Sequence, residues 1–309
     1  MWSYLLRRLL QTVPVIMGVA LIAFVLTELS GNPVREMLGP STTPETIARV
    51  KAFYGFDQPG YQRFALYLGH LARGDFGVSI LNHGLPVRGM ILRGLQVTLK
   101  LALGALLVAT FLGLLSGILS AWRPNSALDY AASFQATLGV SCPAFFLAML
   151  LLLLFAVKLR WFPIGGYEAG EVRYLVLPCL SLGLISTASI SRLTRNCMLE
   201  ALAQDYIRTA RAKGLSAWPV LLGHAFPNAL APVVTVIGNN LAGLLMGAVL
   251  TETVFGLPGI GSVIYKAIFE RDLPVVMGCC IFFALIFVAI NLLVDLCYAL
   301  LDPRIRYGQ

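Results

Sequence analysis

Charged side chains are scarce in this chain of 309 residues. Lys, Arg, Asp and Glu make up only 12% of the sequence, whereas soluble domains carry about 25%. Hydrophobic residues account for 58%, and the mean hydropathy is +0.80. This composition excludes an ordinary soluble domain and indicates several membrane spans.

Motifs for phosphate binding and hydrolysis are also missing. The sequence has no GxxxxGK[ST] loop, since the dipeptide Gly-Lys does not occur, and it has no GxSxG or HExxH motif. Its three histidines, His70, His83 and His224, lie far apart in sequence and outside the apolar runs. We therefore expect that the chain is not an enzyme, that it hydrolyses nothing itself, and that it holds no metal.

Cysteine does not occur in the spacing of a metal or redox site. The six cysteines form no CxxC motif, and all but Cys197 fall inside apolar runs. Cysteine behaves there as a small apolar residue. We therefore interpret these cysteines as packing residues.

Six apolar segments are long enough to cross the bilayer, because a transmembrane helix needs about 20 apolar residues. They lie at residues 9–27, 97–121, 131–157, 174–191, 229–250 and 275–301. We predict an all-α polytopic membrane protein with six transmembrane helices. In the second span, Gly113 and Gly117 have the spacing that allows close helix approach. In the third, Pro143 predicts a kink.

Basic residues outnumber acidic ones, and the net charge is +8. They stand in short loops between the apolar runs, a placement that membrane topology explains better than a nucleic-acid partner does. Short cytoplasmic loops are rich in Lys and Arg. The excess of these residues at both ends and in the central polar segment predicts that the N- and C-termini are cytoplasmic.

The longest polar stretch, residues 30–95, is predicted to be a small ordered region outside the bilayer. It separates an N-terminal segment with the first span (1–29) from a core of five further spans (96–309). Residues 43–54 and 61–72 each carry apolar side chains three and four apart, which predicts two amphipathic helices. In the second helix the shared face consists of Phe64, Leu68 and Leu71.

Five polar residues fall within the apolar segments or at their ends: Asn239, Asn240, Glu252, Asn291 and Asp295. Polar groups at membrane depth are costly and often mark a transport pathway. They can also serve only as hydrogen bonds between helices, worth about 0.6 kcal/mol each. The residues alone leave both interpretations open.

A charged stretch separates the fourth span from the fifth. Within it, Arg208-Thr-Ala210, three residues, Gly214, nine residues and His224-Ala-Phe-Pro227 follow one another. This spacing resembles the permease loop of ATP-binding-cassette (ABC) importers, in which Glu-Ala-Ala is usual at the first positions. The stretch from Asp205 to Gly214 is similar to the dipeptide/oligopeptide/nickel branch of that family.

Other parts of the chain share this resemblance, which covers nearly the whole sequence. The similar stretches are residues 4–8, 57–59, 74–77, 139–143, 252–261 and 302–307. Two positions depart from the pattern of the branch. Asn32 stands in Ser-Gly-Asn-Pro where Pro-Gly-Asp-Pro is usual, and Lys100 stands where an acid is common. Both lie on the predicted outer side, so they affect the expected substrate and not the expected coupling.

The resemblance implies a permease subunit in the bacterial cytoplasmic (inner) membrane. Its expected partners are the lipid bilayer, a second homologous permease chain, two cytoplasmic ATP-binding subunits and an extracytoplasmic substrate-binding protein. ATP and Mg would bind the partner ATPases, and this chain would bind no cofactor. The loop 192–228 would carry a cytoplasmic coupling helix that docks on the ATPase. The residues matched to that loop are Asp205, Arg208, Thr209, Ala210, Arg211, Lys213, Gly214, His224 and Pro227.

Each kind of residue in the loop suits this role. Gly214 would end the helix in the left-handed conformation. Ala210 and Ala212 would allow close packing against the partner, and the basic residues would pair with acids there. Pro219 and Pro227 would bound the segment and make it a stiff lever.

Several alternatives remain open. Within the family, a peptide is the first expected substrate, and nickel or another chelated metal, or a glutathione-like peptide, is the second. Outside the family, a channel or secondary transporter, a membrane enzyme and an exporter subunit are the rival interpretations. A secondary transporter would show inverted repeats, and the sequence has no convincing one.

Overall fold

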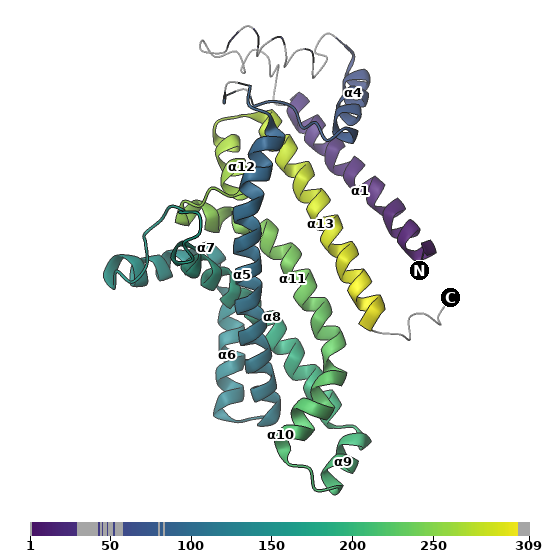
Figure 1. Ribbon diagram of the computed structural model, residues 1–309, viewed down its shortest axis with the longest axis vertical. Coiled ribbons are helices and arrows are strands. Elements are labelled where there is room, and N and C mark those ends of the chain that lie inside the picture. The colour runs from purple at the N-terminus through teal and green to yellow at the C-terminus, as the bar shows by residue number, and fades with distance from the viewer. Residues whose placement is uncertain are drawn as a thin grey trace. The chain divides into compact units, whose positions relative to one another are not determined.

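The chain is all-α in the part that the computed structural model describes, which comprises residues 2–29, 43, 45, 48, 52, 58–79, 81, 82 and 84–301. Side chains 2–10, 27–29, 140, 295 and 297–301 are outside this description. The elements in chain order (Figure 1) are α1 (Trp2–Leu29), α4 (Gly60–Ala72), α5 (Val87–Trp122), α6 (Ala127–Ser141), α7 (Ala144–Leu151), the π-helix η1 (Leu152–Lys158), α8 (Arg173–Leu202), α9 (Asp205–Ala212), α10 (Ala217–Pro219), the π-helix η2 (Val220–Ala225), α11 (Phe226–Phe255), α12 (Ile260–Phe269) and α13 (Leu273–Leu301).

Four helices of the described part are long and apolar enough to cross a membrane, and a bent pair gives a fifth. The four are α5, α8, the continuous helix Ala217–Phe255 and the stretch Leu273–Val294 of α13. The first predicted span corresponds to α1, in which Gln11–Leu26 forms a shorter apolar helix. The predicted all-α polytopic fold is confirmed, while the number of six spans stays a prediction.

The third predicted span is broken and not merely kinked. α6 ends at Ser141, α7 begins at Ala144, and the two are bent by 107°. Proline lacks a backbone N–H and disfavours helical backbone in the residue before it. Accordingly Cys142 is extended, with ψ of 125°, and Pro143 stands at the N-cap of α7.

The predicted polar loop 192–228 is largely helical. α8 continues eleven residues past the predicted end of its span at 191, to Leu202, and the next long helix already begins at Ala217. The helices that contain the predicted fourth and fifth spans are therefore longer than those spans. The polar residues of this segment lie on helices whose other faces are buried, with Thr194 and Met198 both fully enclosed.

The described chain divides into two compact units. The first comprises residues 1–98 and 257–289, and the second comprises residues 99–256 and 290–309. The predicted divisions at residues 29 and 95 stay a prediction.

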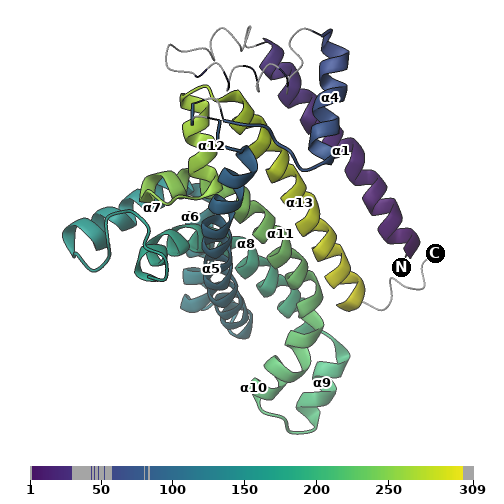
Figure 2. The same ribbon diagram turned by 45° about the horizontal axis from the view of Figure 1, so that its top comes forward.

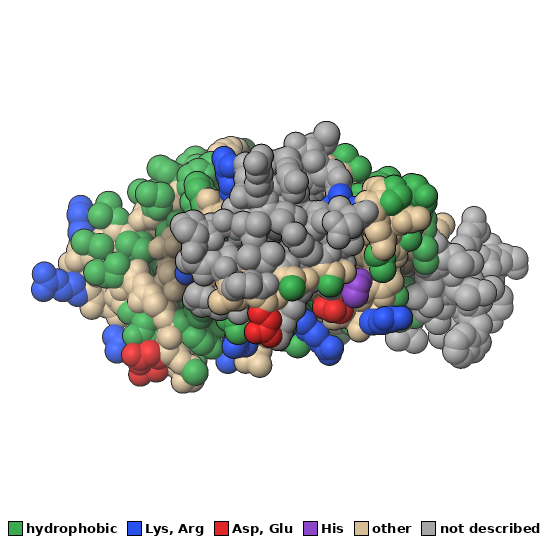
Figure 3. All heavy atoms as spheres, turned by 90° about the horizontal axis from the view of Figure 1, so that it is seen from above, with side chains coloured by type: hydrophobic (Ala, Val, Ile, Leu, Met, Phe, Trp, Pro, Cys, Tyr) green, Lys and Arg blue, Asp and Glu red, His purple; other side chains and the backbone are tan. Residues whose placement is uncertain are grey.

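In the first unit, α4 lies beside α1 (Figure 2). The buried cluster joins α1, α4 and α13 and consists of Ala20, Ala23, Phe24, Tyr67, Met277 and Ile281. Phe64, Leu68 and Leu71 pack against it, as the periodicity of residues 61–72 predicts. The other amphipathic helix, predicted at 43–54, lies mostly outside the described residues. Seen from above, the described side chains at that end of the molecule include both basic and acidic groups (Figure 3).

In the second unit, glycines bring α5 and α8 into close contact. A Cβ atom added to Gly113 would lie 2.7 Å from Ile190 Cβ, and one added to Gly117 would lie 2.6 Å from Thr194 Cβ. Real Cβ atoms do not approach so closely, and only glycine fits at these positions. The close approach predicted from the spacing of the two glycines is confirmed.

Candidate coupling surface and transport pathway

The short helix α9 occupies the stretch that resembles a coupling helix. It spans eight residues, with Asp205 in the first turn, where an acid is favourable beside the N-terminal end of the helix dipole. It ends at Ala212, and Gly214 follows with φ of +83°. A Cβ atom at Gly214 would meet nothing within 4 Å. This position requires glycine for its left-handed backbone and not for space.

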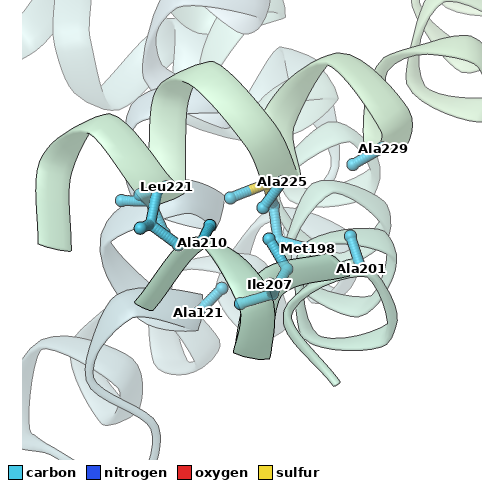
Figure 4. Close-up of a cluster of buried hydrophobic side chains, with 9 residues drawn as sticks. Ala121, Met198, Ala201, Ile207, Ala210, Leu221, Ala225 and Ala229 are labelled. Atoms are coloured by element: carbon cyan, nitrogen blue, oxygen red, sulfur yellow. The ribbon is translucent and has the colours of Figure 1, made fainter. Parts of the chain in front are cut away.

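One face of α9 is buried against its own chain. Ile207 and Ala210 are 1% and 6% exposed. They pack in a cluster of small and medium side chains from α5, α8, η2 and α11 (Figure 4), which we call the coupling-helix seat. Its other members are Ala121, Met198, Ala201, Val220, Leu221, Ala225 and Ala229. The interpretation of Ala210 as a contact with the partner is therefore wrong, because its methyl group already fills a place in this chain.

The remaining face of α9 is exposed and carries its charges. The exposed residues include Asp205, Arg208, Thr209, Arg211 and Lys213. Arg208 Nη1 lies 3.3 Å from Asp205 Oδ1, and the Thr209 hydroxyl donates to the Asp205 carbonyl at 3.1 Å. Arg211 and Lys213 leave the surface basic at the end of the helix, where cations also suit the helix dipole.

Pro219 and Pro227 do not bound the segment that follows α9. α10, η2 and α11 form one continuous helix from Ala217 to Phe255, and both prolines lie within it. The π-helical turn η2 takes up the irregularity, and Asn228 Nδ2 donates to the carbonyl of the exposed His224 at 2.7 Å. The interpretation of the prolines as boundaries is wrong, since the segment owes its rigidity to an unbroken helix.

A partly buried ion pair beside the seat was missed by reasoning from the sequence. Arg195 Nε lies 2.7 Å from Asp129 Oδ1, and Arg195 Nη2 lies 2.7 Å from Asp129 Oδ2. Ser120 donates its hydroxyl to the same carboxylate, and the Asn125 N–H donates at 2.9 Å. The available signal was Ser126 three residues before an acid, a typical helix start, which the structure confirms as the N-cap of α6.

Of the candidate pathway residues, Glu252 lies apart from Asn239 and Asn240 along α11. Asn240 Nδ2 donates to Ser189 Oγ at 3.0 Å, which joins α11 to α8, and the neighbouring Asn239 is exposed. Glu252 is fully buried near the end of α11, about 18 Å further along the helix by its rise per residue. Asn291 is half-buried on α13, and the side chain of Asp295 lies outside the described residues.

Comparison with known proteins places the chain in a family. Residues 109–307 match the model for the binding-protein-dependent transport system inner membrane component. The chain is 40% identical over 334 residues to the dipeptide transport system permease protein DppB of Alkalihalophilus pseudofirmus, covering 99% of this chain and 100% of that protein. It is 42% identical over 314 residues to a putative peptide transport system permease protein of Brucella abortus, with the same coverage. The oligopeptide transport system permease protein AppB of Bacillus subtilis is 36% identical over 316 residues, covering 99% and 100%.

Solved structures share the fold. The MetNI methionine ABC transporter in inward-facing conformations matches with a TM-score of 0.54 at 18% identity, over 69% of this chain and 96% of that one. An amino acid ABC transporter crystallised with histidines matches with a TM-score of 0.51 at 17% identity, over 70% and 94%. The chain therefore belongs to the binding-protein-dependent transport system inner membrane components, as a multi-pass permease subunit of an ABC importer in the bacterial inner membrane that is not itself an enzyme.

Proposed function

We propose that this chain forms, with a second homologous permease, the pathway for a peptide-like solute. An extracytoplasmic substrate-binding protein delivers the solute, and two cytoplasmic ATPase subunits, which hold ATP and Mg, drive its transport. The observation that carries this proposal is full-length similarity, at 36–42% identity, to permeases named for dipeptide, oligopeptide or peptide transport. Those names favour a peptide over nickel, another chelated metal or a glutathione-like peptide.

The exposed face of α9 is the proposed contact with an ATPase subunit. Its basic residues Arg208, Arg211 and Lys213 can pair with acids of the partner, while Ile207 holds the helix on its seat. In this proposal the N- and C-termini lie in the cytoplasm with α9, and the chain binds no cofactor. Movement of the ATPases would displace α9 and the helices around the seat.

Asn239 and Asn240 are the proposed pathway residues with the best structural support. Both lie in the middle of α11, and Asn239 is exposed. An exposed amide at membrane depth is costly against lipid, but it is stable against water, a solute or a partner helix. Glu252, Asn291 and Asp295 are also proposed as pathway residues, because they are polar residues within the apolar segments or at their ends.

Two substitutions at one position test the coupling surface. Asn and Asp both tolerate the left-handed backbone that Gly214 requires, but only Asp adds a negative charge beside Arg211 and Lys213. Tagged wild type, Gly214→Asn and Gly214→Asp are purified in mild detergent, and peptide uptake is measured in cells. We expect wild type to retain the ATPase and a second permease, and Gly214→Asp to lose the ATPase and uptake while still inserting into the membrane.

We expect Gly214→Asn to keep most of both activities. Normal uptake with Gly214→Asp would contradict the coupling role of this surface. Wild type that purifies without an ATPase in every detergent would contradict the importer complex itself. Uptake of nickel without uptake of peptides would replace the proposed substrate.

A further inference from the structure

We propose that Asp129 and Arg195 are positioning residues that make the turn between α5 and α6 part of the seat of α9. Movement of α9 is then passed to α5, α6 and α8 together. This inference rests on the proposed function, because it concerns how the ATPase contact is transmitted through the permease.

The carboxylate of Asp129 is held from all sides. Arg195 contacts both oxygens, Ser120 donates to Oδ1, and the Asn125 N–H donates to Oδ2. Four donors occupy the lone-pair sites of a carboxylate, and a two-pronged arginine contact fixes direction as well as distance. Asp129 is only 4% exposed, while the Arg195 side chain is 28% exposed, so solvent weakens this pair less than it weakens a fully exposed ion pair. The end of α5, the turn, the start of α6 and α8 are therefore tied at one point.

This point is continuous with the seat of α9. Arg195 and Met198 are three residues apart and share a face of α8, and Met198 is fully buried in the seat. On α5, Ser120 directly precedes Ala121, another member of the seat. Arg195 and Ser120, which both bond to Asp129, are thus each next to a residue of the cluster that packs against Ile207.

Aromatic rings join the same turn to α10, the segment that follows α9 in the chain. Trp122, at the end of α5, lies with its ring centroid 4.8 Å from that of Trp218 in α10. The guanidinium of Arg123 lies 4.6 Å from the Trp122 ring centroid. The α5–α6 turn is therefore attached to the helix before α9 through the ion pair and to the segment after α9 through the rings.

Stability alone does not require an ion pair here. Replacing a buried pair by apolar residues of similar volume is often neutral or stabilising, whereas removing one partner leaves a costly buried charge. The ion pair fixes the position of α6 relative to α8. Apolar side chains can slide over one another, whereas a two-pronged ion pair holds its two groups at one distance and in one direction. A double apolar substitution therefore separates positioning from stability.

The test uses the complete importer, with its ATPases, second permease and binding protein, in proteoliposomes. Asp129→Leu combined with Arg195→Met removes both charges and keeps apolar volume. We expect normal assembly and a small loss of thermal stability, because the Ser120 hydroxyl and the Asn125 N–H lose their acceptor. Uptake per ATP hydrolysed should fall by roughly tenfold, within the usual range of coupling between sites. The control is Asp75→Asn, which removes the charge of an exposed carboxylate but keeps the Oδ1 that accepts from the Gly77 N–H.

A wild-type ratio of uptake to ATP hydrolysis in the double variant would overturn the proposal. If the double variant fails to assemble, Arg195→Lys decides instead, because lysine keeps the charge and loses the fork. A reduced ratio in that variant supports positioning, and an unchanged ratio refutes it. The ratio of uptake to ATP hydrolysis is measured only in an importer whose wild type transports. A wild-type ratio in the variants would therefore contradict the role of the ion pair without contradicting the proposed function.

Discussion

Two short amphipathic helices, α4 and α9, show opposite ways of attaching to longer helices. α4 has thirteen residues and buries aromatic rings: Phe64 lies 5.3 Å and Tyr67 lies 6.4 Å from Phe24 of α1, measured between ring centroids. α9 has eight residues and buries only Ile207 and Ala210. Isolated helices shorter than about 12–15 residues are marginal in water, so both depend on their contacts.

The difference separates a contact made entirely within this chain, that of α4, from the contact of α9, which leaves one face of the helix open to a partner. Large rings give α4 an extensive apolar contact with its own chain. The seat of α9 combines four buried alanines with larger side chains such as Met198 and Leu221, and the charged face of the helix is left exposed. A helix with one buried and one exposed, charged face can take part in a second contact, as the proposed docking of the ATPase requires.

The largest effect on stability is expected at Tyr67. Truncating a buried aromatic residue to alanine costs about 3–5 kcal/mol. Tyr67→Ala should therefore lower the thermal unfolding temperature of the detergent-solubilised protein clearly, since the ring lies at the centre of the α4 cluster. An unfolding temperature equal to that of wild type would show that Tyr67 does not hold α4 in place.

Tyr67→Phe is the matched control. The buried Tyr67 hydroxyl has no hydrogen-bond partner among the described residues, so removing it should be neutral or stabilising. Burial raises the pKa of this phenol, which keeps it neutral in the folded state. Because the unfolded phenol ionises at about pH 10, wild type should lose stability relative to Tyr67→Phe as the pH rises above that value.

An intermediate effect is expected at Ile207. Truncating a buried isoleucine costs about 2–5 kcal/mol when the whole fold feels it. Because α9 has only eight residues and buries only Ile207 and Ala210, Ile207→Ala should change the unfolding temperature less than Tyr67→Ala does, but it should abolish retention of the ATPase. Hydrogen exchange of residues 205–212 measures the loss of docking directly.

Ile207→Leu conserves volume and should cost less than about 1.5 kcal/mol, which keeps both exchange protection and ATPase retention. If Ile207→Ala left the amides of α9 as protected as in wild type, the seat would not be what holds this helix.

The smallest effect on stability is expected at Arg208. Its ion pair with Asp205 joins two side chains that are 79% and 93% exposed, and such pairs add little. Arg208→Ala should leave the unfolding temperature unchanged and weaken ATPase retention, with the difference from wild type largest at low salt, where exposed charges are least screened. Lys158→Ala, on the predicted outer side, is the control and should change neither. Full ATPase retention by Arg208→Ala would remove this arginine from the proposed surface.

Apolar runs and local backbone chemistry were readable from the sequence. The runs predicted the membrane-spanning character, and the three-and-four spacing of Phe64, Leu68 and Leu71 predicted the packed face of α4. Pro143 marked the place of the third span's interruption, because the loss of a backbone N–H acts locally, although the sequence predicted a kink and the structure shows a break. These features depend on residues that are neighbours along the chain.

Tertiary structure alone decided the helix ends and the partner of each face. Arg192 and Arg195 read as parts of a polar loop, yet they lie on α8, where Arg192 donates to the Ala136 carbonyl of α6 and Arg195 pairs with Asp129 of the same helix. Asp129 and Arg195 stand 66 residues apart, and no spacing rule pairs them. The sequence showed that Ala210 is small, but only packing showed that its own chain fills the space around it. Local chemistry determines which residues can be buried, whereas the three-dimensional path of the chain determines what buries them.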